Sequence, residues 1–443
     1  MVIFCYPVKT NAQWDLVYQI NPAATLHGLS FINDSVGFTT VNVVVNDNVQ
    51  FYQLNMVLKT QDFGVSWDTI YFEIDNCPCP NDSLYYFSDI YFLDELIGWV
   101  CASNTDRIWK TSNGGISWSI IDSGLSELVG GPTQSSDFST IVFHDANFGV
   151  VQNGNGGLHS MVTWDGGLSW VLLDEYNCWD ISMVDWCNLG MVDGGTIKNF
   201  SDCNYDSQLF PTSQDATSRH GNCIEYWNEE SYICGATGLF GASNFGSVVK
   251  TIDGGLTHYI LDFLWASDAL DIEFYDEQLG YLSIIPHNPT NPDVMLKTLD
   301  GGVTWYSQVI EQNESGFPSL SRIRCPTFDV AYGISNHEIY RTLNGGGPLG
   351  NVYTSVRQQY EPTSELTIFP NPAPEVCKVL IEGINSGEIV LFQIYDITGR
   401  LVQQKQEKYS PPMIIDVSEL KMGQYYITLQ IGDNRQTKGL QKL

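Results

Sequence analysis

The sequence contains few basic residues. Its 443 residues include 20 lysines and arginines against 51 aspartates and glutamates, which gives a formal charge of −31. This balance argues against a broad basic surface for nucleic acid or anionic lipid. Only 16% of the residues are charged while 43% are hydrophobic, so the chain can bury a large core and does not have the composition of a disordered acidic segment.

Other absences narrow the possible functions. No apolar run reaches the roughly 18 residues that a membrane helix needs, so we expect no transmembrane segment. No CxxC pair or Cys/His cluster has zinc spacing, and the seven histidines are scattered. The GxSxG, HExxH and P-loop motifs are also missing. We therefore expect no metal, no cofactor and no catalytic residue that the sequence can identify.

The cysteines and the first residues suit an exported protein. Thr10 and Ala12 occupy the −3 and −1 positions of a signal-peptidase site before Gln13, so we interpret residues 1–12 as a signal peptide truncated at its front. The alternative is an ordinary buried N-terminal strand. Among the 11 cysteines, the plausible disulfide partners, which sequence alone does not pair, are Cys77 with Cys79, Cys178 with Cys187, and Cys203 with Cys223.

Charge is distributed unevenly along the chain. Residues 1–363 hold 42 acidic and 12 basic side chains, whereas residues 364–443 hold 9 and 8. We expect a domain boundary at this step, with a first domain over 13–348, a polar linker over 349–363 and a second domain over 364–443.

A turn phrase recurs through the first domain. It reads Thr-x-Asp/Asn-x-Gly-x-Ser/Thr-Trp in its best copies, and successive threonines are 51, 52, 88, 47 and 44 residues apart. The central acid or amide of each copy is Asp62, Asn113, Asp165, Asp253, Asp300 or Asn344. In such a turn the side-chain oxygen accepts backbone hydrogen bonds, and glycine supplies a positive φ.

A second phrase precedes each copy of the first. It reads apolar-x-aromatic-x-Asp/Asn, usually followed by a glycine, as in Ile90-Tyr-Phe92-Leu-Asp94 with Gly98. Seven copies occur, and one of them fills the 88-residue gap. Short alternating strands and glycine turns with a period of roughly 40–50 residues are typical of a β-propeller. We predict an all-β chain: a seven-bladed propeller, whose last blade is completed by residues 13–20, and a small C-terminal β-sandwich.

The turn phrase resembles the Asp-box, or bacterial neuraminidase repeat. That resemblance implies structural roles for the six acids and amides named above. The Lys-Thr spelling before the turn, as in Lys110-Thr111 and Lys250-Thr251, is similar to that of photosystem-assembly-factor-like propellers. A sialidase also needs an Arg-Ile-Pro segment before the first box, but no arginine precedes Arg107, so sialidase activity is not expected.

Binding is the expected activity of a propeller without catalytic motifs. The long excursions 41–57, 77–86, 122–137, 195–222 and 284–294 are the candidate binding loops, and aromatics such as Tyr85 would suit sugar or peptide stacking. These segments could equally be covers for the blade edges. The leading hypothesis is a binding or adhesion protein for a glycan or protein ligand. The alternative is a glycoside hydrolase or lyase that uses two carboxylates in the propeller channel.

The last eighty residues contain four motifs in order. They read as short strands joined by tight turns, and the motif residues are Pro370, Asn371, Pro372, Tyr395, Asp396, Gly399, Arg400, Gly423, Tyr425, Lys438 and Lys442. This segment resembles the C-terminal sorting domain of type IX secretion cargo in Bacteroidetes. The resemblance implies the type IX secretion machinery as a partner, and a secreted or outer-membrane surface location. The alternative is a generic terminal sandwich for adhesion.

Overall fold

All regular secondary structure in the computed structural model is β-strand, and the chain divides into two compact units, Met1–Gln358 and Gln359–Leu443. The structure describes residues 13–46, 51–75, 84–124, 138–153, 160–174, 180–185, 188–192, 196–201, 204–209, 219–228, 230–240, 243–253, 257–288, 290–292, 294–313, 316–359, 366–369, 373–381, 389–396, 400–409, 413–431 and 434–442. The expected signal-peptide remnant, 1–12, lies outside them. No helix long and apolar enough to cross a membrane occurs in this described part.

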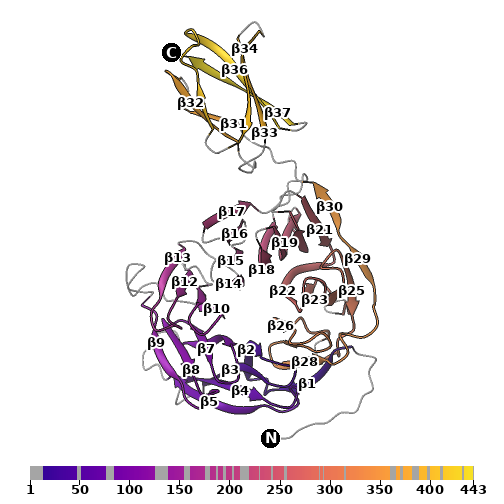
Figure 1. Ribbon diagram of the computed structural model, residues 1–443. Coiled ribbons are helices and arrows are strands. Elements are labelled where there is room, and N and C mark those ends of the chain that lie inside the picture. Colours follow the sequence, from indigo (N-terminus) through magenta and orange to yellow (C-terminus); the bar gives the residue numbers. More distant parts are fainter. Residues whose placement is uncertain are drawn as a thin grey trace. The chain divides into compact units, whose positions relative to one another are not determined.

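The described strands of the first unit form seven antiparallel sheets, or blades, around a ring (Figure 1). In each blade the innermost strand carries the second sequence phrase. Blades 1 to 3 are β2 (Ala24–Phe31), β3 (Gly37–Asn46), β4 (Phe51–Thr60) and β5 (Asp68–Asp75); β6 (Tyr86–Phe92), β7 (Gly98–Ser103), β8 (Arg107–Thr111) and β9 (Ser119–Asp122); and β10 (Phe138–Phe143), β11 (Gly149–Asn153), β12 (Ser160–Thr163) and β13 (Val171–Asp174).

The next two blades follow the same order from the centre outward. Blade 4 is β14 (Asp180–Asp185), β15 (Asn188–Val192), β16 (Thr196–Ser201) and β17 (Asn204–Leu209). Blade 5 is β18 (Arg219–Asn228), β19 (Ser231–Phe240), β20 (Ser243–Thr251), β21 (Thr257–Phe263) and an added fifth strand, β30 (Val356–Gln359).

The last two blades hold the added strand β29 and the N-terminal strand β1. Blade 6 is β22 (Ala266–Phe274), β23 (Gly280–Pro286), β24 (Met295–Thr298), β25 (Thr304–Gln308) and β29 (Val352–Thr354). Blade 7 is β26 (Arg322–Arg324), β27 (Ala331–Ile334), β28 (Glu338–Thr342) and β1 (Asp15–Gln19).

The ring closes between distant parts of the chain. β1 pairs antiparallel with β28, with Asp15 opposite Arg341 and Gln19 opposite Glu338. This pairing confirms the prediction that residues 13–20 complete the last blade. The buried carboxylate of Glu338 accepts hydrogen bonds from Gln19 Nε2 (3.2 Å), Asn313 Nδ2 (2.7 Å) and Tyr340 Oη (2.8 Å), so one acid joins three segments of the closure.

The structure differs from the polar linker expected over 349–363. Within that range, β29 pairs with β25, placing Trp305 opposite Tyr353, and β30 extends blade 5. Tyr353 also contacts the rings of Phe263 and Trp265. A polar strand covering the edge of a sheet needs few apolar residues of its own, so its composition resembles that of a linker.

The second sequence phrase has a packing explanation. In blade 2 the ring of Phe92 lies over Gly98, where an added Cβ would come within 2.7 Å of the ring. The same ring stacks on Phe38 of blade 1 at 3.5 Å between centroids. Asp94 Oδ1 accepts the N–H groups of Leu96 and Ile97, both at 2.7 Å, and closes the turn to the next strand. Each phrase thus joins its own hairpin to the neighbouring blade.

The repeated turn is held by its own side chains. In blade 3, Asp165 accepts Thr163 Oγ1 (2.8 Å), Ser169 N (2.9 Å) and Ser169 Oγ (2.6 Å). These hydrogen bonds, chiefly from Ser169, lower the pKa of Asp165 to about 2. Gly166 and Gly167 have φ values of 73° and 89°, a region that favours glycine. We name residues of this motif the repeat turn.

Lysines that come just before three of the repeat threonines connect neighbouring blades. Lys110 Nζ donates to Gly166 O in the next blade at 2.7 Å, and Lys250 Nζ donates to Gly301 O at 2.5 Å. Lys297 makes the same contact with Gly345 O. These lysines therefore stabilise the ring, a role that the sequence analysis did not assign to them.

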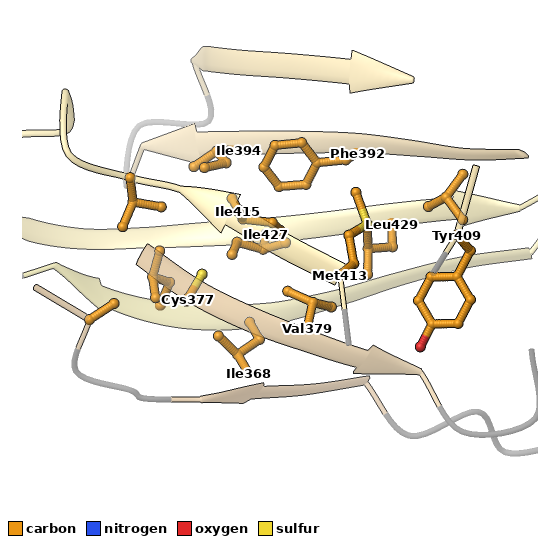
Figure 2. Packing of buried hydrophobic residues seen from close by; sticks show 14 residues of the cluster. Ile368, Cys377, Val379, Phe392, Ile394, Tyr409, Met413, Ile415, Ile427 and Leu429 are labelled. Atoms are coloured by element: carbon orange, nitrogen blue, oxygen red, sulfur yellow. The ribbon is translucent and has the colours of Figure 1, made fainter. Parts of the chain in front are cut away.

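The second unit contains two sheets with one shared core (Figure 2). One sheet is β31 (Leu366–Phe369), β32 (Val376–Ile381) and β35 (Met413–Asp416), and the other is β34 (Leu401–Lys408), β33 (Ile389–Asp396), β36 (Gly423–Ile431) and β37 (Asn434–Lys442). Val379 and Ile415 from the first sheet pack with Phe392 and Ile427 from the second. This is the layered packing of a β-sandwich.

Candidate functional site

The innermost strands bring charged side chains to the axis of the ring. In each of them a buried apolar residue, such as Ile90 or Ile272, packs into a core between blades, while the residues on either side of it point away from that core. These flanking positions hold carboxylates in blades 2, 4, 5 and 6 and two arginines in blade 7. We name the set the axial cluster: Asp89, Asp180, Glu225, Asp271, Glu273, Arg322 and Arg324.

Electrostatic contacts show that the members of the axial cluster meet. Arg324 interacts with Glu273, Asp271, Asp89 and Asp180, which come from blades 6, 2 and 4. Blades 2, 4 and 7 are not neighbours around the ring, so side chains from all three can approach one another only at its axis. The propeller channel therefore contains convergent charges.

Three aspartates of the axial cluster also hold the ring together. Asp89 Oδ2 accepts Ile141 N at 3.1 Å, Asp180 Oδ2 accepts Ile224 N at 2.9 Å, and Asp271 Oδ2 accepts Ile323 N at 2.5 Å. Each bond connects one blade to the innermost strand of the next. These three aspartates therefore have a structural role, in addition to any role in binding a ligand.

Arg324 is the main positive partner in the axial cluster. Its Nη1 lies 3.9 Å from Asp271 Oδ2 and 3.6 Å from Glu273 Oε2, and it donates to the carbonyl of Ile323 at 2.6 Å. Its side chain is 27% exposed, so water or a ligand can reach it. One guanidinium group thus orients two carboxylates and remains accessible.

Glu225 lies within electrostatic reach of the like charge of Glu273. Burial, followed by the like charge of Glu273, raises the pKa of Glu225 well above its usual range. Burial raises the pKa of Glu273 to about 7, although Arg324 opposes the shift. Burial and the like charge of Asp271 also raise the pKa of Asp180 to about 7. The axial cluster therefore holds bound protons near neutral pH.

The axial cluster can perform two kinds of chemistry. Carboxylates and guanidinium groups hydrogen-bond to sugar hydroxyls and to charged peptide groups, and its five acids against two arginines favour ligands with donors or positive charge. A protonated carboxyl beside an ionised one could also act as an acid–base pair. In the described part of the chain, no group of three His, Cys, Asp or Glu residues is placed to hold a metal ion.

The site residues predicted from the sequence lie outside the axial cluster. The repeat-turn residues Asp62, Asn113, Asp165, Asp253, Asp300 and Asn344 all accept a hydrogen bond from their own threonine, and none of them belongs to the axial cluster. A signal for the axial aspartates was nevertheless present. Asp-Ile recurs at positions 89, 180 and 271, evenly spaced 91 residues apart, in alternate blades.

The candidate binding loops are partly replaced by strands. Segment 41–57 is mostly the hairpin of β3 and β4, and 195–222 contains β16, β17 and the start of β18. Tyr85 is buried against Trp109, with ring centroids 5.5 Å apart, so it is unavailable for stacking on a ligand. Residues 76–83 and 125–137 lie outside the described residues.

The proposed pairing of Cys203 with Cys223 is wrong. Cys223 is a free, buried thiol, as are Cys101, Cys234, Cys325 and Cys377. The Cys223 side chain packs in the core between blades 5 and 6, where burial raises its pKa. Cys77, Cys79, Cys178, Cys187 and Cys203 lie outside the described residues, so the other two pairings stay predictions.

The motif residues of the second unit make local contacts. Asp396 accepts Arg400 N and Arg400 Nε, both at 3.1 Å, and Tyr425 Oη donates to Lys421 O at 2.9 Å. Lys442 is buried and donates to the carbonyl of Pro374. Lys438 lies on β37 opposite Ile427. Pro370, Asn371, Pro372 and Gly399 lie outside the described residues.

Comparison with known proteins gives a different result for each of the two units. Residues 367–442 match the secretion system C-terminal sorting domain, which marks cargo of type IX secretion, so the chain is exported to the cell surface or secreted. No curated protein matches the sequence.

Solved structures resemble the propeller. A structure of YCF48 bound to D1 peptide is 16% identical, with a TM-score of 0.50 over 76% of this chain and 96% of that one. YCF48 from Cyanidioschyzon merolae is 15% identical, also with a TM-score of 0.50, over 76% of this chain and all of that one. A GH74 enzyme from Niastella koreensis is 12% identical, with a TM-score of 0.42 over 94% of this chain and 71% of that one. The YCF48 likenesses show the propeller fold and confirm the predicted all-β class.

Proposed function

We propose that this chain is an exported binding protein whose axial cluster is the site for a glycan or protein ligand. The observation that carries the proposal is the convergence of five carboxylates and two arginines from blades 2, 4, 5, 6 and 7, with the Arg324 side chain accessible among them. Charged side chains are costly to hold together in a partly buried site unless they are paired or serve a ligand. Here the acids outnumber their basic partners.

The proposal extends to the organisation of the chain. Residues 13–348 form a seven-bladed Asp-box propeller of the photosystem-assembly-factor-like type, and residues 364–443 form the sorting domain recognised by the type IX machinery. The threonine-to-acid hydrogen bonds in six repeat turns support the first assignment. The match over 367–442 supports the second. The motif residues Tyr395, Asp396 and Arg400 would then belong to the surface that the machinery reads.

Glu225 is the member of the axial cluster best placed to contact a ligand. Its carboxylate accepts no hydrogen bond from the described residues, in contrast to the three aspartates, each of which accepts a backbone N–H. A carboxylate with unused acceptor sites gains most from a ligand hydroxyl or ammonium group. Glu225 and the exposed part of Arg324 therefore form the core of the proposed site.

A glycan-array screen of the full chain, combined with analysis of the supernatant for released sugars, tests this function. Retention of one glycan class without new products supports binding. If no glycan is retained, a peptide array tests whether the chain binds a protein ligand instead. Failure on both arrays contradicts the proposal.

A glycoside hydrolase is the second candidate, because a specific observation favours it. Burial raises the pKa values of both Glu225 and Glu273, and the like charge of Glu273 raises that of Glu225 further, so one of them can remain protonated beside an ionised partner. This arrangement suits a general acid and a second carboxylate. Release of sugars that is lost in both Glu225→Gln and Glu273→Gln would establish hydrolysis in place of simple binding.

A further inference from the structure

One end of blades 1, 2, 3, 6 and 7 presents an equivalent pair of turns within the described residues. In an antiparallel blade, the turn between the first and second strands lies at the same end as the turn between the third and fourth. The two turns are joined by backbone hydrogen bonds in several blades: Gly114 N to Leu96 O in blade 2 (2.9 Å), Gly166 N to Asn147 O in blade 3 (2.7 Å), and Gly301 N to Gln278 O in blade 6 (2.9 Å). We name this surface the turn face: 32–36, 61–66, 93–97, 112–117, 144–148, 164–169, 275–279, 299–303, 326–330 and 343–347.

Large apolar side chains are exposed at equivalent places on the turn face. The position after the second glycine of the repeat turn holds Ile116, which is 83% exposed, and Leu168, which is 70% exposed. Val65 in blade 1 occupies the same position and is 56% exposed. The position after the threonine holds Trp164, Leu299 and Leu343, all exposed as well. The pattern repeats from blade to blade and is not a scatter of single residues.

The fold gains little from the most exposed of these groups, Ile116 and Leu168. The hydrogen bonds of the repeat turn involve its threonine, acid, glycine and serine residues, and the tryptophan indole donates to a glycine carbonyl, as Trp305 Nε1 does to Gly302 O at 3.0 Å. A side chain as exposed as Ile116 adds little packing. Its apolar surface stays in contact with water until something covers it.

The turn face is also strongly acidic. Its segments contain no lysine or arginine, while Asp94, Glu95, Asp145, Glu277 and Asp329 are exposed on it. The basic side chains that border it are engaged with its carbonyls: Lys110, Lys250 and Lys297 donate to glycine carbonyls of the turns, and Arg341 donates to Phe63 O. Apolar groups on the turn face therefore lie among acidic side chains, and the basic groups that border the face are bound to its carbonyls.

We propose that the turn face binds a cationic polypeptide segment that carries apolar side chains between its lysines or arginines. Charge complementarity selects this occupant. A second copy of the chain would bring the same acidic face against itself, and an anionic lipid or lipopolysaccharide surface would be repelled. This site is separate from the axial cluster and does not depend on the function proposed for it.

Fluorescence anisotropy with short synthetic peptides tests the proposal on the full chain. A leucine–lysine peptide should bind, and a leucine–glutamate peptide of the same length should not. A serine–lysine peptide should bind at least about tenfold more weakly, because it supplies charge without apolar contact. The double variant Ile116→Ser/Leu168→Ser should weaken leucine–lysine binding by about tenfold or more, with an unchanged unfolding midpoint.

A matched pair of substitutions serves as the control. Leu264 and Val44 are 72% and 54% exposed but lie outside the turn face, so Leu264→Ser/Val44→Ser should leave peptide affinity unchanged. Equal weakening by both pairs would overturn the proposal, as would equal binding of the leucine–lysine and serine–lysine peptides. A dimer in solution that dissociates in the Ile116→Ser/Leu168→Ser variant would overturn it in favour of self-association.

Discussion

Replacing Arg324 with methionine is the sharpest test of how the axial cluster is held together. The change keeps the length of the aliphatic stem but removes the guanidinium group that lies within 4 Å of both Asp271 and Glu273. Removing one partner of a buried ion pair costs about 3–5 kcal/mol. Because the Arg324 side chain is 27% exposed, we expect a loss of about 2–4 kcal/mol in the free energy of unfolding at pH 8.

The loss should depend on pH with a defined sign. Without Arg324, the pKa values of the neighbouring carboxyls rise further, and the folded variant takes up protons as pH falls. Protonated carboxyls do not repel one another, so the penalty should shrink to about half or less at pH 5. The double variant Arg324→Met/Glu273→Gln should recover part of the loss at pH 8, because it removes one of the carboxylates left without a partner.

Urea unfolding followed by tryptophan fluorescence isolates the relevant unit. All 12 tryptophans lie between residues 14 and 305, so the signal reports on the propeller and not on residues 359–443. An equal loss at pH 5 and pH 8, or a loss below about 0.5 kcal/mol at both, would refute the pairing described here.

Three further predictions concern the propeller. Asp180 and Glu273 have pKa values of about 7 in the folded chain, above the values near 4 of an unfolded chain. The free energy of unfolding should therefore fall as pH rises from about 4 to about 7 and then level off, because the folded chain holds more protons in that range. Urea titrations across that pH range measure this dependence. Lys250→Met should cost about 1.5–3 kcal/mol in the same assay, whereas Lys421→Met on the exposed surface of the second unit should cost nothing there. Glu338→Leu should cost about 2–4 kcal/mol and increase proteolysis before residue 20, because it leaves four side-chain donors around the ring closure without their acceptor.

The fold was accessible from sequence because its determinants are local and repeated. A glycine beneath Phe92, or an acid or amide in a repeat turn, acts within one hairpin, and the same residue types recur from blade to blade. The strand completing the last blade was also predictable, since a seventh unit without its outer strand implied a donor at the other end of the chain.

The axial cluster could not be read in the same way. Asp89 and Arg324 are distant in sequence and become neighbours only when the ring closes, and no local rule shows which flanking residues face the axis. The evenly spaced Asp-Ile pairs indicate three positions of the axial cluster, but they do not show that these side chains lie near one another. The strands β29 and β30 were not predicted from the sequence, because a polar strand on the edge of a blade has no hydrophobic pattern of its own.

The central claim is that the axial cluster is where the exported propeller binds its ligand. Glu225→Gln tests it most directly, because the amide keeps the shape of a side chain whose carboxylate accepts no hydrogen bond within the described part of the chain. The affinity of the best array ligand for the full chain, measured by titration calorimetry, should fall by about tenfold or more in Glu225→Gln and stay unchanged in Glu277→Gln, an exposed acid of the turn face. Equal affinity in wild type and Glu225→Gln would contradict the account.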